Sequence, residues 1–337
     1  MIRVSFLVAT FAAFLMTAIS GYGVIPWLRK LKYGQTINEI GPTWHQSKQG
    51  TPTMGGLMFF VGVLAGVIAG YSLLLKSEPS FMEETYQNQT VSLFISVFGA
   101  LAFGIIGFID DYIKVVKKRN LGLTEKQKLI LQFIVTAAFL IAQYSIGHLN
   151  TTITLPWIGQ LDLGYFYYPI VFMGIIFMVN AVNLTDGIDG LCSSVTFIVA
   201  LGFFMISASY GYYANSIFCC ALAGALAGFL FWNFYPAKVF MGDTGSMFLG
   251  GSVVAMAWAV NRPEVLVIIG IIYTCEALSV VIQVTYFKLT HGKRIFKMSP
   301  IHHHFEMSGW SEVKIVCIFS LVAVIFSALA YLYMYMC

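Results

Sequence analysis

The sequence carries little charge. Asp, Glu, Lys and Arg make up 10% of its 337 residues, and hydrophobic residues make up 58%. Soluble globular domains carry about 25% charged residues. With so few charged side chains the chain cannot cover a water-facing surface, which excludes the ordinary soluble classes and favours a protein that lies in a membrane. The net charge of +4 adds little, because the positions of the charges matter more than their sum.

The sequence also lacks the cysteine spacings of a redox or metal-binding protein. None of its six cysteines stands in a CxxC pair, and all of them lie in or beside apolar runs. We interpret them as small apolar packing residues: Cys192, Cys219, Cys220, Cys275, Cys317 and Cys337. No periodic repeat or low-complexity tract divides the chain, so we expect one integral membrane domain over residues 1–337.

The N-terminus resembles a signal peptide, because Arg3 precedes an apolar run that ends in small residues near Gly21. The apolar stretch continues to Leu28, however, and is longer than the 7–15 residues of a signal-peptide core. We therefore interpret it as a retained first span.

Apolar runs predict an all-α, polytopic membrane protein. A spanning helix needs about 20 mostly apolar residues. Ten candidate runs occur, at 4–28, 55–75, 91–112, 128–147, 165–182, 191–213, 215–235, 244–260, 264–287 and 313–336. The runs at 165–182, which is short, and at 244–260, which begins among polar residues, are the least typical.

Lys and Arg predict the orientation of these spans, since short cytoplasmic loops carry an excess of both. Most basic residues fall in loops on one side: Arg29, Lys30, Lys32, Lys48, Lys114, Lys117, Lys118, Arg119, Lys126, Lys128, Lys238, Lys288, Lys293, Arg294 and Lys297. The opposite loops hold Lys76 and Arg262, and Arg3 disagrees with the pattern. The basic loops are thus expected in the cytoplasm, and ten spans then put both termini outside.

The first polar motif ends an apolar run with adjacent carboxylates, Asp110 and Asp111. Successive helical residues point about 100° apart, so the two cannot share one direction. Lys114 follows Asp110 by four residues and Asp111 by three, within reach of both. The pair suits a magnesium–phosphate site at the membrane boundary. The alternative is an interfacial ion pair that ends the helix.

The second motif, residues 180–190, contains Asn183, Asp186, Gly187 and Asp189. Asp186 and Asp189 can share one helical face or line a turn, and Gly187 allows close backbone approach to a ligand. A tight turn between two spans would explain the glycines but not the two aspartates at the membrane edge.

The third motif runs from Asn233 through Phe240 to Asp243 and Ser246, directly before a span. Gly, Thr and Ser at a helix start can present backbone N–H groups to phosphate, and Asp243 can hold a hard cation. Asp243 can instead be a simple N-cap, although an N-cap needs neither of the glycines that flank it.

The fourth motif holds half of the six histidines in one run, His302, His303 and His304. A zinc site is the obvious competitor, but adjacent histidines rarely direct three rings at one ion. We interpret the run as binding and polarising phosphate or pyrophosphate. The alternative is a solvated loop without a functional role.

The fifth motif, residues 48–56, places Lys48 before a turn rich in Gly, Pro and Thr. It can meet phosphate or simply anchor a turn. Glu276 lies inside a candidate span and is assigned a packing role there, with Thr274, Ser279 and Gln283 as neighbours.

These five stretches, in this order, resemble those of the bacterial phospho-N-acetylmuramoyl-pentapeptide transferases, within the polyprenyl-phosphate N-acetylhexosamine-1-phosphate transferase superfamily. The resemblance runs from Lys48 to His304. It implies transfer of phospho-N-acetylmuramoyl-pentapeptide from UDP-N-acetylmuramoyl-pentapeptide to undecaprenyl phosphate. The products are UMP and lipid I, the first lipid intermediate of peptidoglycan synthesis.

The resemblance also implies Mg²⁺ as cofactor, ten transmembrane helices with both ends periplasmic, and a homodimer in the bacterial inner membrane with a cytoplasmic active site. The expected partners are the two substrates and the lipid bilayer, with no nucleic acid. Catalytic roles fall on Lys48, Asp110, Asp111, Asp243, His302, His303 and His304, and Asp243 resembles the magnesium ligand. Substrate-binding roles fall on Lys114, Asn183, Asp186, Gly187, Asp189, Asn233 and Phe240.

Such a reaction makes one phosphoanhydride while it breaks another, so it needs no ATP. Phosphate monoesters have a second pKa of about 6, which makes the acceptor a competent nucleophile at neutral pH. We expect direct attack by the lipid phosphate, with Asp110 or Asp111 orienting or deprotonating it. The rival is attack by an aspartate to give an acyl phosphate.

Two other functions remain open. A sister enzyme would transfer an unsubstituted N-acetylhexosamine phosphate with the same aspartates. A transporter would need charges near the bilayer midplane, whereas these cluster at one face.

Overall fold

The computed structural model describes residues 2–31, 48–78, 81, 84–117, 122–156 and 159–336. Helices dominate it: α1 (Ile2–Lys30), α2 (Gly56–Ser77), α3 (Glu84–Lys117), α4 (Glu125–Ser145), α5 (Tyr167–Thr185), α6 (Leu191–Ser209), α7 (Tyr213–Asn233), α8 (Gly242–Ala259), α9 (Val265–Ile269), α10 (Ile271–Leu289), α11 (Ile301–Glu306) and α12 (Glu312–Met336). Of the basic residues used to orient the chain, Lys32, Lys118 and Arg119 lie outside the described residues.

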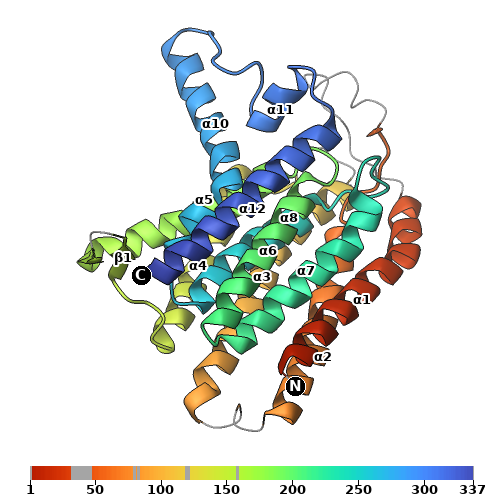
Figure 1. Cartoon of the computed structure of the whole chain (residues 1–337). Coiled ribbons are helices and arrows are strands. Elements are labelled where there is room, and N and C mark those ends of the chain that lie inside the picture. The colour runs from red at the N-terminus through yellow and green to blue at the C-terminus, as the bar shows by residue number, and fades with distance from the viewer. Residues whose placement is uncertain are drawn as a thin grey trace.

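The long helices form one bundle around α8 (Figure 1). α3 packs along α8, and α1 packs against both α2 and α7. Every residue from Thr244 to Val260 is buried, so the part of α8 that follows its first two residues is enclosed by protein on all sides. The apolar core is continuous through the bundle, because each outer helix turns one face toward its neighbouring helices and the opposite face outward.

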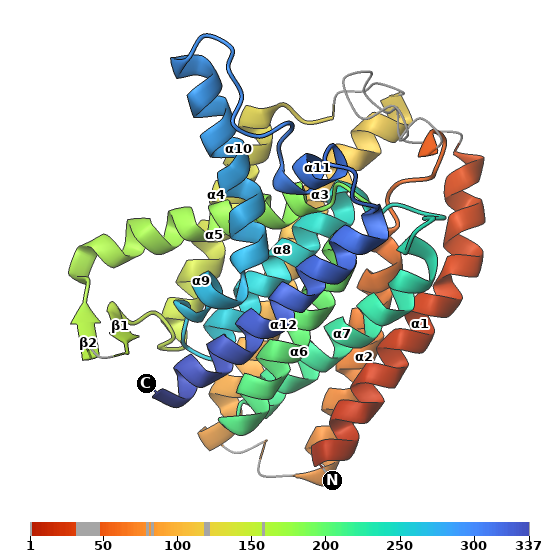
Figure 2. The same cartoon turned by 45° about the horizontal axis from the view of Figure 1, so that its top comes forward.

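Chain segments that are far apart in sequence meet at the end of the bundle nearest α11 (Figure 2). Hydrogen bonds and ion pairs join the end of α3 to the starts of α4 and α8, the end of α5 to α8, and residue 48 to the start of α12. All five polar motifs contribute residues to this end. The C-terminal end of α10 projects away from the bundle.

Eight helices in the described ranges are long and apolar enough to cross a membrane: α1 to α7 and α12. The predicted spans at 244–260 and 264–287 are helical but fall outside this set. The first corresponds to α8, which is enclosed and needs no lipid-facing apolar surface. The second is interrupted at Gly270, which separates α9 from α10. The protein is therefore helical and polytopic, with eight candidate spans.

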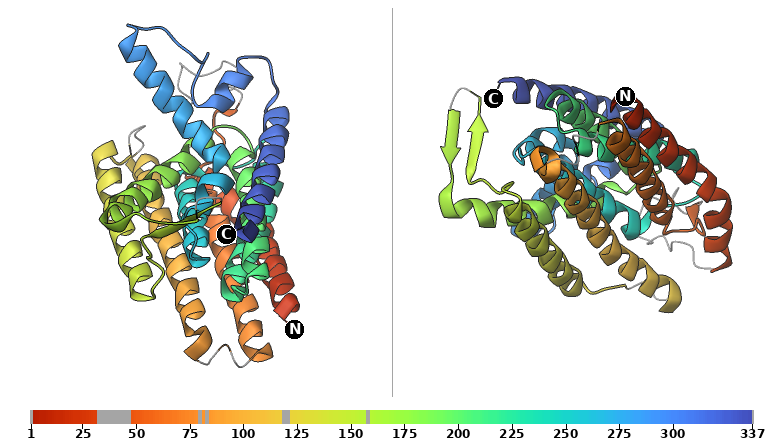
Figure 3. Two further views of the ribbon diagram at one scale, coloured as in Figure 1. Left: turned by 60° about the vertical axis from the view of Figure 1, so that its left-hand side comes forward. Right: turned by 90° about the horizontal axis from the view of Figure 1, so that it is seen from below.

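The structure adds a small β-hairpin that the all-α prediction did not include. β1 (Thr152–Leu155) pairs antiparallel with β2 (Gly159–Asp162), and a single turn of 3-10 helix, Gly164–Phe166, leads into α5. The hairpin and both chain ends lie away from α11 (Figure 3). The termini thus lie on the side of the bundle that is remote from the polar motifs.

Candidate active site

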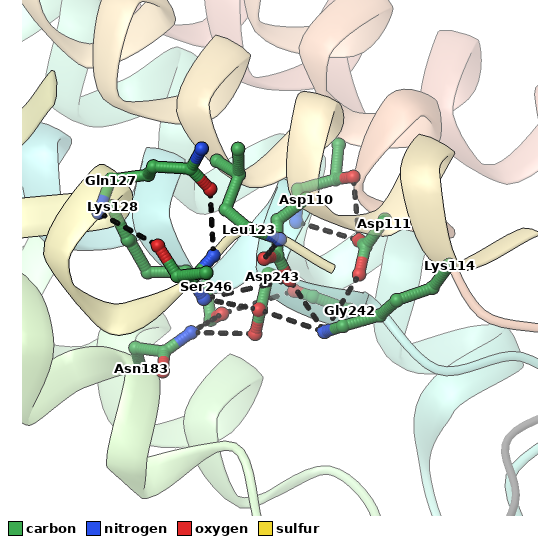
Figure 4. Close-up of polar contacts among 12 residues, drawn as sticks. Asp110, Asp111, Lys114, Leu123, Gln127, Lys128, Asn183, Gly242, Asp243 and Ser246 are labelled. Atoms are coloured by element: carbon green, nitrogen blue, oxygen red, sulfur yellow. Dashed lines mark hydrogen bonds and ion pairs between the residues drawn. The ribbon is translucent and has the colours of Figure 1, made fainter. Parts of the chain in front are cut away.

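Three carboxylates converge at the polar end of the bundle, and we call them the acidic cluster. Asp110 and Asp111 lie near the C-terminal end of α3, and Asp243 lies in the first turn of α8 (Figure 4). One oxygen from each lies within 4.8 Å of the others, and this is the one group of three or more possible metal ligands in the described part of the chain. The alternative in which Asp110 and Asp111 only end a helix does not explain why Asp243 joins them.

Backbone and hydroxyl donors fix two of these carboxylates. Asp111 Oδ2 accepts the Thr244 N–H at 2.9 Å and the Thr244 hydroxyl at 2.7 Å. Asp110 Oδ1 accepts the Leu123 N–H at 2.8 Å. One aspartate is therefore held by α8 and the other by the segment before α4, while one oxygen of each still reaches the shared cluster, although their spacing on the helix predicts different directions.

Two lysines share the acidic cluster. Lys114 Nζ lies 2.5 Å from Asp110, 3.8 Å from Asp111 and 3.1 Å from Asp243. Lys128 Nζ, from the first turns of α4, lies 2.8 Å from Asp243 and 3.5 Å from Asp110. Both lysine side chains keep partial exposure, 30% and 22%, so their ammonium groups are accessible from outside the cluster.

The end of α5 completes the cluster. Asn183 donates from Nδ2 to Asp243 Oδ1 at 2.9 Å and lies 2.8 Å from the Ser246 hydroxyl. Asp243 is thus held through one oxygen by an amide and through the other by two lysines. It does more than cap a helix.

Glycine allows α3 and α8 to approach this closely. A Cβ on Gly107 would overlap the carbonyl of Asp243. A side chain at that position would push α8 away from α3, and Asp243 would move with it.

A second polar group surrounds residues 186–190, which we call the 186–190 turn. Asp189 Oδ1 accepts from Lys48 Nζ at 2.7 Å, and Asp189 Oδ2 accepts from the Ala237 N–H at 2.8 Å. Glu312, at the start of α12, accepts from the same Lys48 ammonium at 2.6 Å and from the Asp189 N–H at 3.0 Å. Lys48 therefore bridges two carboxylates from distant parts of the chain.

The three histidines point to three different partners. His302 Nδ1 lies 3.0 Å from Glu276, and both side chains are fully buried. His303 Nδ1 lies 2.6 Å from Glu306, and His304 Nδ1 accepts the Lys297 N–H at 3.1 Å. The rings do not converge on one point, which disfavours the zinc alternative.

Asn233 and Phe240 shape the segment between α7 and α8. Asn233 donates to the Val239 carbonyl at 3.1 Å and accepts from the Ser193 hydroxyl at 2.8 Å. The Phe240 backbone pairs with Pro52 and Gly55 at 2.9 and 2.8 Å. These bonds bring the fifth motif, residues 48–56, alongside the third.

Asp186 lies between the two groups and is only partly exposed. Desolvation by the surrounding protein, together with the charges of Asp243, Asp111 and Asp189, raises the pKa of Asp186 to about 8. Its carboxyl group is thus protonated over most of the neutral range.

Sequence reasoning overlooked three residues of this region. The sequence pattern predicts only a loop cation at Lys128 and a packing role for Glu276, and it does not mark Glu312. A capping box of Thr124 and Gln127 starts α4 at Glu125, and this pattern is the local signal that Lys128 lies in the first turns of a helix. No local signal marks Glu312, because only the tertiary fold brings α12 to the 186–190 turn.

Comparison with known proteins gives consistent matches. The sequence profile of glycosyl transferase family 4 matches residues 93–261, and signature 1 of the phospho-N-acetylmuramoyl-pentapeptide-transferases matches residues 48–60. A phospho-N-acetylmuramoyl-pentapeptide-transferase of Clostridium perfringens is 46% identical over 98% of this chain and 99% of its own length. The one from Halalkalibacterium halodurans is 47% identical over 94% of each chain.

Proposed function

Because this chain belongs to the phospho-N-acetylmuramoyl-pentapeptide transferases, we propose that it transfers phospho-N-acetylmuramoyl-pentapeptide from UDP-N-acetylmuramoyl-pentapeptide to undecaprenyl phosphate. The products are UMP and undecaprenyl-diphospho-N-acetylmuramoyl-pentapeptide (lipid I). This step belongs to peptidoglycan synthesis, and through it to cell wall biogenesis, cell shape and cell division.

The acidic cluster is the observation that carries this proposal. Asp110 and Asp243 are 133 positions apart in the sequence, yet their carboxylates share Lys114 and Lys128. Carboxylates beside partly exposed ammonium groups suit a substrate that brings a diphosphate and a divalent ion together.

The residues of the acidic cluster fit Mg²⁺. The donors are carboxylate oxygens, which this hard cation prefers, and they lie close enough to serve one ion. We propose Asp243 as the principal ligand, with Asp110 and Asp111 beside it. When bound, Mg²⁺ would neutralise diphosphate charge and stabilise the departing phosphate.

The chain's own groups act around the reacting phosphates. A phosphate oxygen of undecaprenyl phosphate attacks the sugar-bearing phosphorus, a new P–O bond forms, and the bond to UMP breaks with its electron pair leaving on UMP. Lys114 and Lys128 attract both anions and stabilise charge on the oxygens. Asp111 is the better placed of the pair to orient or deprotonate the acceptor, because the one contact of its Oδ1 in the described part of the chain is Lys114 Nζ at 3.8 Å.

The rival route begins with attack by an aspartate to form an acyl phosphate. Both Asp110 and Asp111 are held by backbone N–H donors, which favours an orienting role over an attacking one. Mixing enzyme with the nucleotide substrate but no lipid acceptor discriminates the routes. UMP released in stoichiometric amount with enzyme would contradict direct attack.

The remaining predicted site residues are proposed to act on the substrates. Lys48, His302, His303 and His304 are assigned to the catalytic machinery, and Asn183, Asp186, Gly187, Asp189, Asn233 and Phe240 to the uridine nucleotide. The hydrogen bonds that join residues 48–56 to residues 240–241, and Lys48 to Asp189, support one continuous binding region.

We propose ten membrane passages, with α8 and the α9–α10 pair added to the eight candidate spans. Both chain ends lie away from α11 and so from the end of the bundle where the polar motifs meet, which supports a periplasmic location for the termini and a cytoplasmic active site at the inner membrane. A single domain over residues 1–337 and a homodimer complete the proposal. Reporter fusions to the C-terminus and the mass of the detergent-solubilised particle test these points.

Release of UMP tests the function directly. Purified full-length protein in detergent is mixed with UDP-N-acetylmuramoyl-pentapeptide, undecaprenyl phosphate and Mg²⁺. We expect release that requires both substrates and disappears with EDTA or in Asp243→Ala. Asp162→Ala, on the exposed hairpin, is the matched control and keeps full release.

Two results would overturn the proposal. One is absence of release by the wild-type protein under these conditions. The other is equal release when UDP-N-acetylglucosamine replaces the muramoyl substrate, which would favour the sister enzyme that transfers an unsubstituted N-acetylhexosamine phosphate.

A further inference from the structure

We propose that two buried glutamates, Glu276 of α10 and Glu312 of α12, are positioning residues that fix the 186–190 turn in its substrate-binding geometry. The inference rests on the proposed function for what the turn binds. Neither glutamate lies in a motif stretch, and neither contacts the acidic cluster through any hydrogen bond or ion pair among the described residues.

Glu312 holds the Asp189 side of the turn. A single oxygen, Oε2, accepts the Asp189 N–H and the Lys48 ammonium, and Lys48 donates in turn to the Asp189 carboxylate. The glutamate thus fixes the backbone of Asp189 directly and its side chain through Lys48. The Ala237 N–H occupies the other Asp189 oxygen, so the residue is held on three sides.

Glu276 holds the Gly187 side through His302. Glu276 Oε2 lies 3.0 Å from His302 Nδ1, close enough for a hydrogen bond that fixes the orientation of the ring. Nε2 is buried, has no hydrogen-bond partner within the described ranges and faces Gly187, where an added Cβ would overlap the ring. The imidazole ring therefore lies directly against the Gly187 backbone, and Glu276 sets its orientation.

Simple packing does not account for Glu276. Its side chain is fully buried, and Oε1 has no hydrogen-bond partner among the described residues. A buried carboxylate that is only half satisfied destabilises the fold relative to an apolar residue of similar size. A requirement for one ring orientation of His302 explains its presence.

The turn links the nucleotide region to the acidic cluster. It follows directly after α5, whose Asn183 binds Asp243, so a shift of residues 186–190 changes where a bound nucleotide lies relative to the carboxylates. We therefore expect loss of either glutamate to weaken productive nucleotide binding more than it slows the chemical step.

Steady-state kinetics of UMP release and local hydrogen exchange test the inference on the full-length protein. Glu276→Ala and Glu312→Ala are expected to raise KM for UDP-N-acetylmuramoyl-pentapeptide by about tenfold, with kcat changed much less. Glu276→Gln should restore most of the loss, because a side-chain amide both donates and accepts and so still forms a hydrogen bond with His302 Nδ1. Glu312→Gln should restore less, because the neutral amide cannot balance the Lys48 charge.

Glu264→Ala is the matched control. Glu264 pairs with Arg262 beyond the far end of α8, so its loss should leave KM unchanged. Hydrogen exchange of the backbone amides in the peptide covering residues 187–191 should accelerate in Glu276→Ala and in Glu312→Ala. If Glu312→Ala does not fold, Glu312→Gln replaces it in this measurement and should also show acceleration. It should not accelerate in the control.

Unchanged KM and unchanged local exchange in the glutamate variants would overturn the inference, as would a fall in kcat alone. If the wild-type protein releases no UMP, the proposed function fails, while the exchange measurement still decides whether the glutamates hold the turn.

Discussion

The acidic cluster and the 186–190 turn use the same kinds of side chain in different ways. In the acidic cluster, Asp243 accepts from the ends of two long, partly exposed lysines. In the turn, Asp189 accepts from a backbone N–H and from the less exposed Lys48, which a second carboxylate also holds. Partners of the first kind can move to meet a ligand, whereas partners of the second kind hold the chain in place.

This difference predicts that substitutions in the acidic cluster reduce the rate, while substitutions at the turn reduce nucleotide affinity. The experiments below sharpen or contradict that separation, in order of expected effect.

Asp111→Asn should have the largest effect. The amide can still accept from Thr244, so the fold is retained, but the charge next to the reacting phosphates is lost. We expect kcat for UMP release to fall by roughly 10²–10³-fold. Asp162→Asn on the hairpin serves as control. A variant that keeps kcat and changes only KM would contradict the assignment of Asp111 to chemistry.

Lys128→Met should come next. It removes the ammonium group that lies 2.8 Å from Asp243 and leaves Lys114 in place. We expect kcat to fall by about ten- to a hundredfold, since one of two charged donors is lost. Lys126→Met changes an exposed lysine of the same helical turn and should be silent. Equal losses of kcat in the two variants would show that kcat depends on the net charge at this end of the bundle and not on the contact between Lys128 and Asp243.

Gly187→Ala tests the turn without touching a charged group. The new Cβ would overlap the His302 ring, so the ring or the turn must move. We expect KM for the nucleotide substrate to rise by about five- to tenfold with kcat largely kept. Gly174→Ala, where a Cβ meets open space on α5, is the matched control. A fall in kcat with unchanged KM would erase the distinction between the two regions.

Asp186→Asn should have the smallest effect, and it depends on pH. The folded protein raises the pKa of this carboxyl group from 3.8 to about 8, so the free energy of unfolding falls progressively as pH rises from about 4 to about 8. Asparagine does not titrate, so the variant does not lose stability in this way. Thermal unfolding in detergent should therefore show the variant gaining a few degrees over the wild-type protein between pH 5 and pH 8.5. A constant difference across this range would mean that Asp186 does not titrate there.

The sequence predicted the acidic cluster better than the turn for a physical reason. Asp110, Asp111 and Lys114 lie on one helix, so helical spacing alone puts the lysine within reach of both carboxylates, and the structure confirms it. The partners of the 186–190 turn come from α10 and α12, and no local pattern marks Glu276 or Glu312 as neighbours of that turn. Such contacts depend on how whole helices pack.

Hydropathy had a similar limit for α8. A span is recognised by apolar residues that face lipid, but α8 faces protein on every side and can carry small and polar residues along its length. The interruption at Gly270 is likewise a local change of backbone angles, to φ −89° and ψ 17°, between α9 and α10. The apolar run at 264–287 does not show where its helix ends.

The enclosure of α8 has a consequence for how this protein responds to its surroundings. No residue from Thr244 to Val260 is exposed, so acyl chains do not touch the helix whose first turn carries Asp243. A thinner or thicker bilayer tilts the outer helices first. Any such deformation reaches the Asp243 carboxylate through the helices that pack on α8, chiefly α3 and α5, or through Lys128 of α4, which buffers the reacting groups against changes in lipid composition.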